Sequence, residues 1–166
     1  MLNLKKLFKP NAEWNAAHAL YAASVSAGRD PVFFGVWGVP DSAEGRFEAL
    51  SMVAFLALRR LKQPLLPSSL SQAYFDIMFD DIDSNLREMG VGDITVGKKV
   101  KKLAESFYGR IKAYEAGIDA NDDTALTVAL GKFLFRGVTP SVETLVAACG
   151  YMRAQAQHLA DQHDAQ

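Results

Sequence analysis

FDIMFDDIDSNLREMGVGDITVGKKVKKLAESFYGRIKAYEAGI, residues 75–118, decides the fold, because its apolar residues repeat at helical spacing on both sides of the turn GVGD. Before the turn, the apolar arc consists of Phe75, Met78, Phe79, Ile82, Leu86 and Met89; after it, the arc consists of Val96, Val100, Leu103, Phe107, Ile111 and Tyr114. The glycines of GVGD, residues 90–93, end the first helix and leave only a short connection. The segment therefore predicts two helices that are antiparallel neighbours.

The same helical period continues over most of the chain and predicts an all-α, single-domain bundle of about six helices over residues 1–166. The predicted helices cover about 12–26, 43–62, 69–89, 93–117, 123–135 and 140–159. The predicted N-terminal caps are Ser68 or Ser69 for the third helix, Asn121, Asp122 or Asp123 for the fifth, and Thr139 before Pro140 for the sixth. The segment 29–42, which contains Phe33, Phe34 and Trp37, is too rich in Gly and Pro for a helix and is expected to be non-helical. Residues 1–10 form a basic N-terminal segment, and 160–166 form a polar tail that is expected to fray.

The composition is that of a globular protein in a reducing compartment. Of the 166 residues, 49% are hydrophobic and 22% are charged, and the formal net charge of −1 argues against a generally basic nucleic-acid-binding protein. Cys149 is the only cysteine, so no internal disulfide can form, and its apolar helix side predicts a core position. The apolar run 49–58 is too short to cross a membrane, and residues 1–10 lack the form of a secretory signal. These features predict a cytoplasmic protein, and no motif predicts a cofactor.

Four charged residues of the segment 75–89 share one helix face. At 100° per residue, Asp76, Asp80, Asp83 and Arg87 form a stripe beside the apolar arc, while Asp81 points elsewhere. One hypothesis is a divalent-metal-dependent helical enzyme that uses Asp76, Asp80 and Asp83. Such a site needs carboxylates from at least two elements or an aspartate-rich DDxxD repeat, and DDID, residues 80–83, is not that repeat. The other interpretations are a solvated face and a protein-binding surface.

A basic helix follows the acidic one. Lys98, Lys101 and Lys102 point away from the apolar arc, whereas Lys99 and Arg110 lie near its edge and are expected to reach the aspartate stripe. Exposed salt bridges contribute only about 0 to 1 kcal/mol each, so stability gives little reason for such dense charge of both signs. The dense charge is explained either by a solubilising face or by a partner-binding face.

The sequence resembles the ubiquinol-cytochrome c chaperones, a family of helical assembly factors for cytochrome b of respiratory complex III. The resemblance lies in GVPDSAEGRFEAL at 38–50, in the segment 75–118 quoted above, and in DDTALTVALGKFLF at 122–135. It is similar to the short bacterial form, because no N-terminal extension carries a mitochondrial address. The resemblance implies a non-enzymatic chaperone that holds newly made cytochrome b or another complex III subunit, with a small helical protein as a further partner. A generic helical scaffold that binds other proteins is the alternative.

This role suggests which residues touch which partner. A membrane-protein client exposes apolar helices and positive cytoplasmic loops. Phe33, Phe34 and Trp37 are expected to meet the helices, and the stripe Asp76, Asp80, Asp83 and Arg87 is expected to meet the loops. Lys98, Lys101 and Lys102 are expected to face ribosomal RNA or anionic lipid of the inner membrane, on whose cytoplasmic side the protein would be peripheral. Tyr108 projects away from the apolar arc and is expected to be a surface contact. The alternatives are buried aromatic residues and solvated charges.

Overall fold

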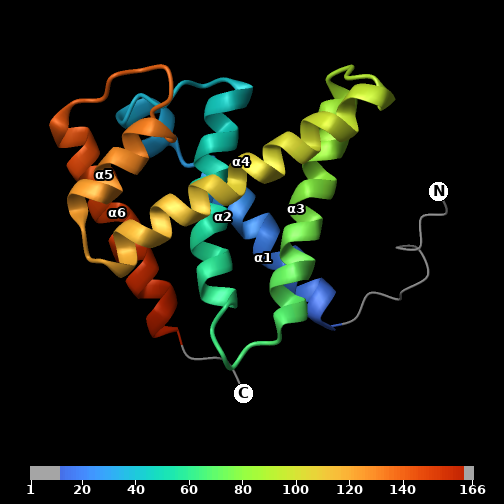
Figure 1. The fold of residues 1–166 in the computed structure, drawn as a ribbon, viewed down its shortest axis with the longest axis horizontal. Helices are drawn as coiled ribbons and strands as arrows, with labels where there is room; N and C mark the ends of the chain where they lie inside the picture. Colours follow the sequence, from blue (N-terminus) through green and yellow to red (C-terminus); the bar gives the residue numbers. More distant parts are fainter. Residues whose placement is uncertain (1–11, 163–166) are drawn as a thin grey trace.

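The computed structural model describes residues 12–162 and contains six α-helices, one π-helical turn and no strand within that range (Figure 1). The elements are α1 Ala12–Gly28, η2 Val32–Val36, α2 Ala43–Leu61, α3 Ser68–Glu88, α4 Asp93–Asp119, α5 Asp123–Lys132 and α6 Val142–Asp161. The all-α prediction is confirmed. The predictions for the basic segment 1–10 and for the end of the tail fall largely outside the described residues. No helix in the described range is long and apolar enough to cross a membrane.

Helix α2 forms the centre of the bundle. It packs against α1, α3, α4 and α6, and α4 runs across it (Figure 1). Eleven of its nineteen residues are buried, among them Met52, Phe55 and Leu58. Removing such side chains from water is the main source of stability, at about 25 cal/mol per Å² of apolar surface. Because α2 is covered on several sides, it positions the helices that surround it.

Helices α3 and α4 form the predicted hairpin and diverge from its tip (Figure 1). Gly90 has φ +85°, a conformation that L side chains rarely adopt. The amide of Val91 donates to the carbonyl of Leu86 at 3.0 Å, and the amide of Gly90 donates to the carbonyl of Arg87 at 2.9 Å. This pattern is a Schellman C-cap, so the prediction of a glycine stop is confirmed.

The segment predicted to be non-helical contains the π-helical turn η2. The amide of Trp37 donates to the carbonyl of Val32 at 2.9 Å, an i to i+5 hydrogen bond. Pro31 has φ −55° and is compatible with a helical start, because a proline lacks only an amide that the first turn does not need. Gly38, with φ +74°, follows the turn. The prediction was therefore wrong for 32–36 and right for most of the remaining segment.

Three helix ends differ from the prediction. The third helix begins at Ser68 after Pro67, and no side chain caps it. The sixth begins at Val142, because Ser141, rather than Thr139, accepts a hydrogen bond from the amide of Thr144 at 3.1 Å. The fifth begins after Asp122, as one of the three alternatives proposed, but it ends at Lys132 instead of near residue 135.

Two glycines allow the chain to approach itself closely. A Cβ atom at Gly45 would lie 1.8 Å from the carbonyl oxygen of Pro40, and a Cβ atom at Gly117 would lie 3.0 Å from the backbone of Leu126. Gly45 thus lets the segment before α2 fold back onto the first turn of that helix. Gly117 lets α5 pack closely against α4 after the connection at residues 120–122.

Candidate protein-binding surface

The acidic stripe lies on the outer side of α3. Asp76 is half-buried and accepts a hydrogen bond from Nε2 of Gln72 at 3.0 Å, and Asp80 is exposed. Asp83 accepts a hydrogen bond from Nε of Arg87 at 2.5 Å. Asp76 and Asp83 are therefore each engaged by a side chain of their own helix.

Arg87 connects the two helices of the hairpin at its tip. Besides Asp83, its guanidinium binds the carboxylate of Asp93, the first residue of α4. Hydrogen bonding to Asp83 raises the pKa of Arg87 above its usual value, with a smaller contribution from Asp93. The stripe predicted from the helical wheel is thus partly an ion-pair network that closes the hairpin.

The three lysines predicted to face outward, Lys98, Lys101 and Lys102, are exposed on α4. Lys101 lies 4.0 Å from Glu105, at the limit of an ion pair. Arg110, in contrast, does not reach the aspartate stripe, and that prediction was wrong. Arg110 lies on the side of α4 that crosses α2, and there it is buried against Glu48.

An aromatic ridge joins α3 and α4 along the hairpin. Tyr108 of α4 is 58% exposed and stacks on Phe75 of α3, with ring centroids 5.5 Å apart and planes at 26°. Phe75 in turn packs against Phe79 at 4.6 Å and Phe107 at 6.4 Å. Tyr108 therefore has the exposed position predicted for it, and it rests on the half-buried ring of Phe75, with the buried rings of Phe79 and Phe107 beneath.

Two apolar side chains at the hairpin tip were missed as site residues. Met89 is 67% exposed and Ile94 is 87% exposed. Met89 belongs to the predicted buried arc, but it follows the last residue of α3 and no helix covers it. Ile94 lies opposite Val96 on the wheel of α4, and this position already indicates exposure. Isolated exposed apolar residues are common, but these two flank one turn.

The aromatic segment is separate from the hairpin. Phe33 is fully buried, and Phe34 and Trp37 are half-buried. Phe33 and Trp37 pack edge-to-face on Tyr151 of α6, at centroid distances of 5.9 and 5.5 Å. In Figure 1 the blue turn of η2 lies near α5 and α6, far from the hairpin tip. The structure therefore favours the alternative of packed aromatic residues, most strongly at Phe33.

No group of three or more His, Cys, Asp or Glu side chains in residues 12–162 is arranged to hold a metal ion. Cys149 is buried, as expected, and burial together with the charge of Asp123 raises the pKa of its thiol. A raised pKa disfavours the reactive thiolate.

Comparisons with known proteins confirm the resemblance. The family model described as ubiquinol-cytochrome C chaperone matches residues 36–166. Ubiquinol-cytochrome-c reductase complex assembly factor 1 of Xenopus laevis is 26% identical over 145 residues, which cover 87% of this chain and 72% of that protein. The human protein of that name is 26% identical, and this chain spans about half of its length, 48%.

The crystal structure of the Cbp3 homolog from Brucella abortus has the same fold. Its TM-score is 0.80 at 36% sequence identity, over 97% of this chain and 90% of that one. Fold, family model and relatives agree: the chain belongs to the ubiquinol-cytochrome c chaperone family.

Proposed function

We propose that this protein is a non-enzymatic assembly chaperone that holds newly made cytochrome b of ubiquinol-cytochrome c reductase at the cytoplasmic face of the inner membrane. The family membership supports the assembly role. The α3–α4 hairpin supports the mode of binding, because the same two helices present exposed apolar side chains, an acidic stripe on α3 and three lysines on α4. This juxtaposition is the observation that carries the proposal.

The hairpin suits an unassembled membrane protein in two ways. Tyr108, Met89 and Ile94 offer apolar contact to a helix that is not yet packed. Asp76 and Asp80 offer negative charge to the positive loops that membrane proteins keep on the cytoplasmic side. Phe33 is left out of the proposed surface because it is buried.

The lysines Lys98, Lys101 and Lys102 extend the proposal to an anionic surface. They are exposed side by side on α4, and such clusters are attracted both to lipid headgroups and to RNA phosphate. Flotation with vesicles of phosphatidylglycerol and sedimentation with purified ribosomes distinguish the two sources. Replacing the three lysines with glutamine should weaken whichever association is found.

The client surface is tested by charge reversal. We expect Asp76→Lys/Asp80→Lys to reduce the recovery of cytochrome b with the tagged protein by about tenfold, the equivalent of about 1.4 kcal/mol. Asp83 stays unchanged, because its pair with Arg87 closes the hairpin. The control, Glu44→Lys/Asp161→Lys, makes the same change of net charge at exposed residues of α2 and α6. Both variants should keep the wild-type circular dichroism spectrum. Equal recovery with both variants would show that the stripe is not the client surface.

The assembly role is tested in the source organism. Deletion of the gene should lower the level of assembled ubiquinol-cytochrome c reductase. Complementation with the wild type or with the Glu44→Lys/Asp161→Lys control should restore that level, whereas Asp76→Lys/Asp80→Lys should not. Normal levels of the complex and of cytochrome b in the deletion strain would refute the proposed function.

A further inference from the structure

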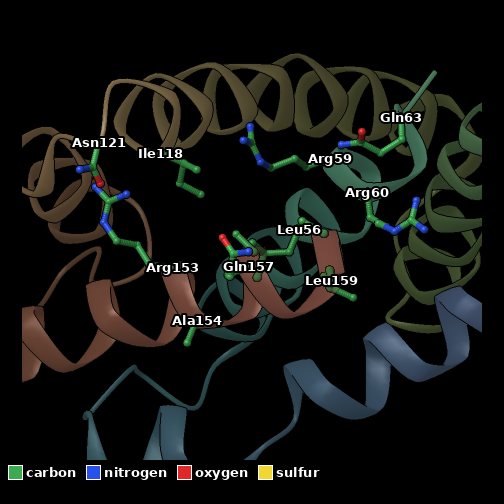
Figure 2. A pocket seen from close by; sticks show the side chains of 12 residues that line it. Leu56, Arg59, Arg60, Gln63, Ile118, Asn121, Arg153, Ala154, Gln157 and Leu159 are labelled. Atoms are coloured by element: carbon green, nitrogen blue, oxygen red, sulfur yellow. The ribbon is translucent and has the colours of Figure 1, made fainter. Parts of the chain in front are cut away.

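A groove of about 540 Å³ lies between α2, α4 and α6 (Figure 2). Ile118 and Asn121 place it at the C-terminal end of α4, away from the hairpin tip. Its apolar lining consists of Leu56, Ile118, Leu159 and the alanines 154, 156 and 160. Its polar lining consists of Arg59, Arg60, Arg153, Gln63, Asn121 and Gln157. The described residues that line it thus include three cations and no carboxylate.

The three arginines are spread along the groove. Arg153 lies at one end, Arg60 at the other, and Arg59 between them (Figure 2). Charges placed at intervals along an apolar surface fit an extended ligand that carries several anionic groups. A single small anion would need them to converge on one point.

The guanidinium groups of Arg59 and Arg153 are held in place by ion pairs at the edge of the groove. Arg59 pairs with Asp119 at 2.7 Å, and Arg153 pairs with Asp123 at 2.5 Å and donates to the carbonyl of Gly117 at 3.2 Å. These aspartates are themselves 56% and 74% exposed, so the pairs are screened by water and weak. A guanidinium has five N–H donors, so Arg59 and Arg153 can donate to further carboxylates while they stay over the groove.

We propose that this groove binds an acidic amphipathic helix of a partner protein. The stretch from residue 153 to residue 160 of α6 rises about 10 Å at about 1.5 Å per residue, which matches about two turns of a bound helix. Apolar side chains of that helix lie on Leu56 and Ile118, and its glutamate or aspartate side chains reach Arg59 and Arg153. Opposite charge across the interface selects the partner and speeds its encounter.

The groove is a poorer match for an anionic lipid. An acyl chain requires a long apolar channel, but here the apolar lining is interrupted by the amides of Gln63 and Gln157 and by the guanidinium groups of the arginines. The proposal is independent of the client surface, because the groove attracts negative charge whereas the stripe on α3 attracts positive charge. A negative result for the groove therefore does not refute the client surface, and a negative result for the client surface does not refute the groove.

The test uses the full chain and a synthetic probe. A fluorescein-labelled helical peptide of about 15 residues carries a ridge of leucines flanked by glutamates. A matched peptide carries glutamine in place of each glutamate. Binding is followed by fluorescence anisotropy for the wild type, for Arg59→Gln/Arg153→Gln and for Gln157→Trp, which fills the centre of the groove without removing a cation. The control is Arg46→Gln/Arg136→Gln, which removes two exposed cations elsewhere.

We expect saturable binding of the glutamate peptide that weakens about tenfold in Arg59→Gln/Arg153→Gln and in Gln157→Trp, and stays within about twofold of wild type in the control. The glutamine peptide should bind about tenfold more weakly than the glutamate peptide. Hairpin variants should not alter any of these values. No saturation of the wild type at about 1 mM peptide, or equal affinities among the variants, overturns the proposal. Flotation with phosphatidylglycerol vesicles that depends on Arg59 and Arg153, without peptide binding, overturns it in favour of a lipid site.

Discussion

The ion pair between Glu48 and Arg110 should be among the most sensitive points of the fold. Both side chains are 4% exposed, and the guanidinium contacts both carboxylate oxygens, with Nε 2.6 Å from Oε2. Arg110 also donates to the carbonyl of Ser106 at 2.7 Å and lies 4.9 Å from the ring centre of Phe133. Removing one partner leaves a buried charge without its counterion, at a cost of about 3 to 5 kcal/mol.

The perturbations are Arg110→Met, Glu48→Leu and the double variant. Each single change should lower the free energy of unfolding by about 3 to 5 kcal/mol, which for a chain of this length lowers Tm by roughly 6 to 20 °C. The double variant replaces both charges with apolar side chains of similar volume and should lie within about 2 kcal/mol of wild type. Urea denaturation of the four proteins then measures the coupling directly.

The control is Arg46→Met, which makes the same substitution in an ion pair whose side chains are 65% and 59% exposed. Its cost should be much smaller than that of Arg110→Met, because water screens an exposed ion pair. If Arg110→Met costs no more than Arg46→Met, or if the two single changes at Glu48 and Arg110 simply add, the pair is not the buried, coupled unit described above.

Three further predictions follow from packing, titration and ligand chemistry. Gly45→Ala should destabilise the protein by about 2 kcal/mol or more in urea denaturation, because the new Cβ atom meets the carbonyl of Pro40. Gly97→Ala should stabilise the protein by about 0.5 to 1 kcal/mol, because the space around Gly97 is open. Burial raises the pKa of Tyr74 to about 12 and also raises the pKa of Tyr21 and of Tyr114. The free energy of unfolding should therefore be unaffected below about pH 10 and fall between about pH 10 and 12, with about 3 kcal/mol lost through Tyr74. An unchanged urea midpoint at about pH 11 contradicts this. Addition of about 5 mM MgCl2 or MnCl2 should leave Tm unchanged, because no three His, Cys, Asp or Glu side chains of residues 12–162 are grouped to hold an ion. A clear rise in Tm revives the metal-dependent alternative.

Much of the fold could be predicted from the sequence because apolar periodicity and glycine stops are local signals. The period of α3 and α4 identified both helices, and Gly90 ended the first of them as expected. Helix starts were less predictable, since several neighbouring residues can cap equally well and the surrounding structure decides among them. Ser141 caps α6 although Thr139 and Pro140 have the stronger sequence pattern.

The candidate site was harder to predict because a helical wheel shows direction but not neighbours. Arg110 lies near the edge of the apolar arc, as the wheel indicates, but the helix it faces there is α2 and not α3. The groove could not be found in the sequence either. It combines residues 56–63, 118–121 and 153–160, none of which carries a recognisable motif.

The Glu48–Arg110 pair also joins two of the sequence blocks that carry the family resemblance. Glu48 belongs to the block 38–50 and Arg110 to the block 75–118, and the two meet where α4 crosses α2. Helix α4 has 27 residues and is about 40 Å long, with the hairpin tip at one end and the arginine-lined groove at the other. A buried pair about two thirds of the way along α4 fixes it on α2 and therefore holds the two proposed surfaces in one arrangement. Tyr108, on which Phe75 beside Asp76 stacks, is ten residues or about 15 Å along α4 from Ile118 of the groove. This separation exceeds a Debye length of about 8 Å, so a basic and an acidic partner can be bound at the same time.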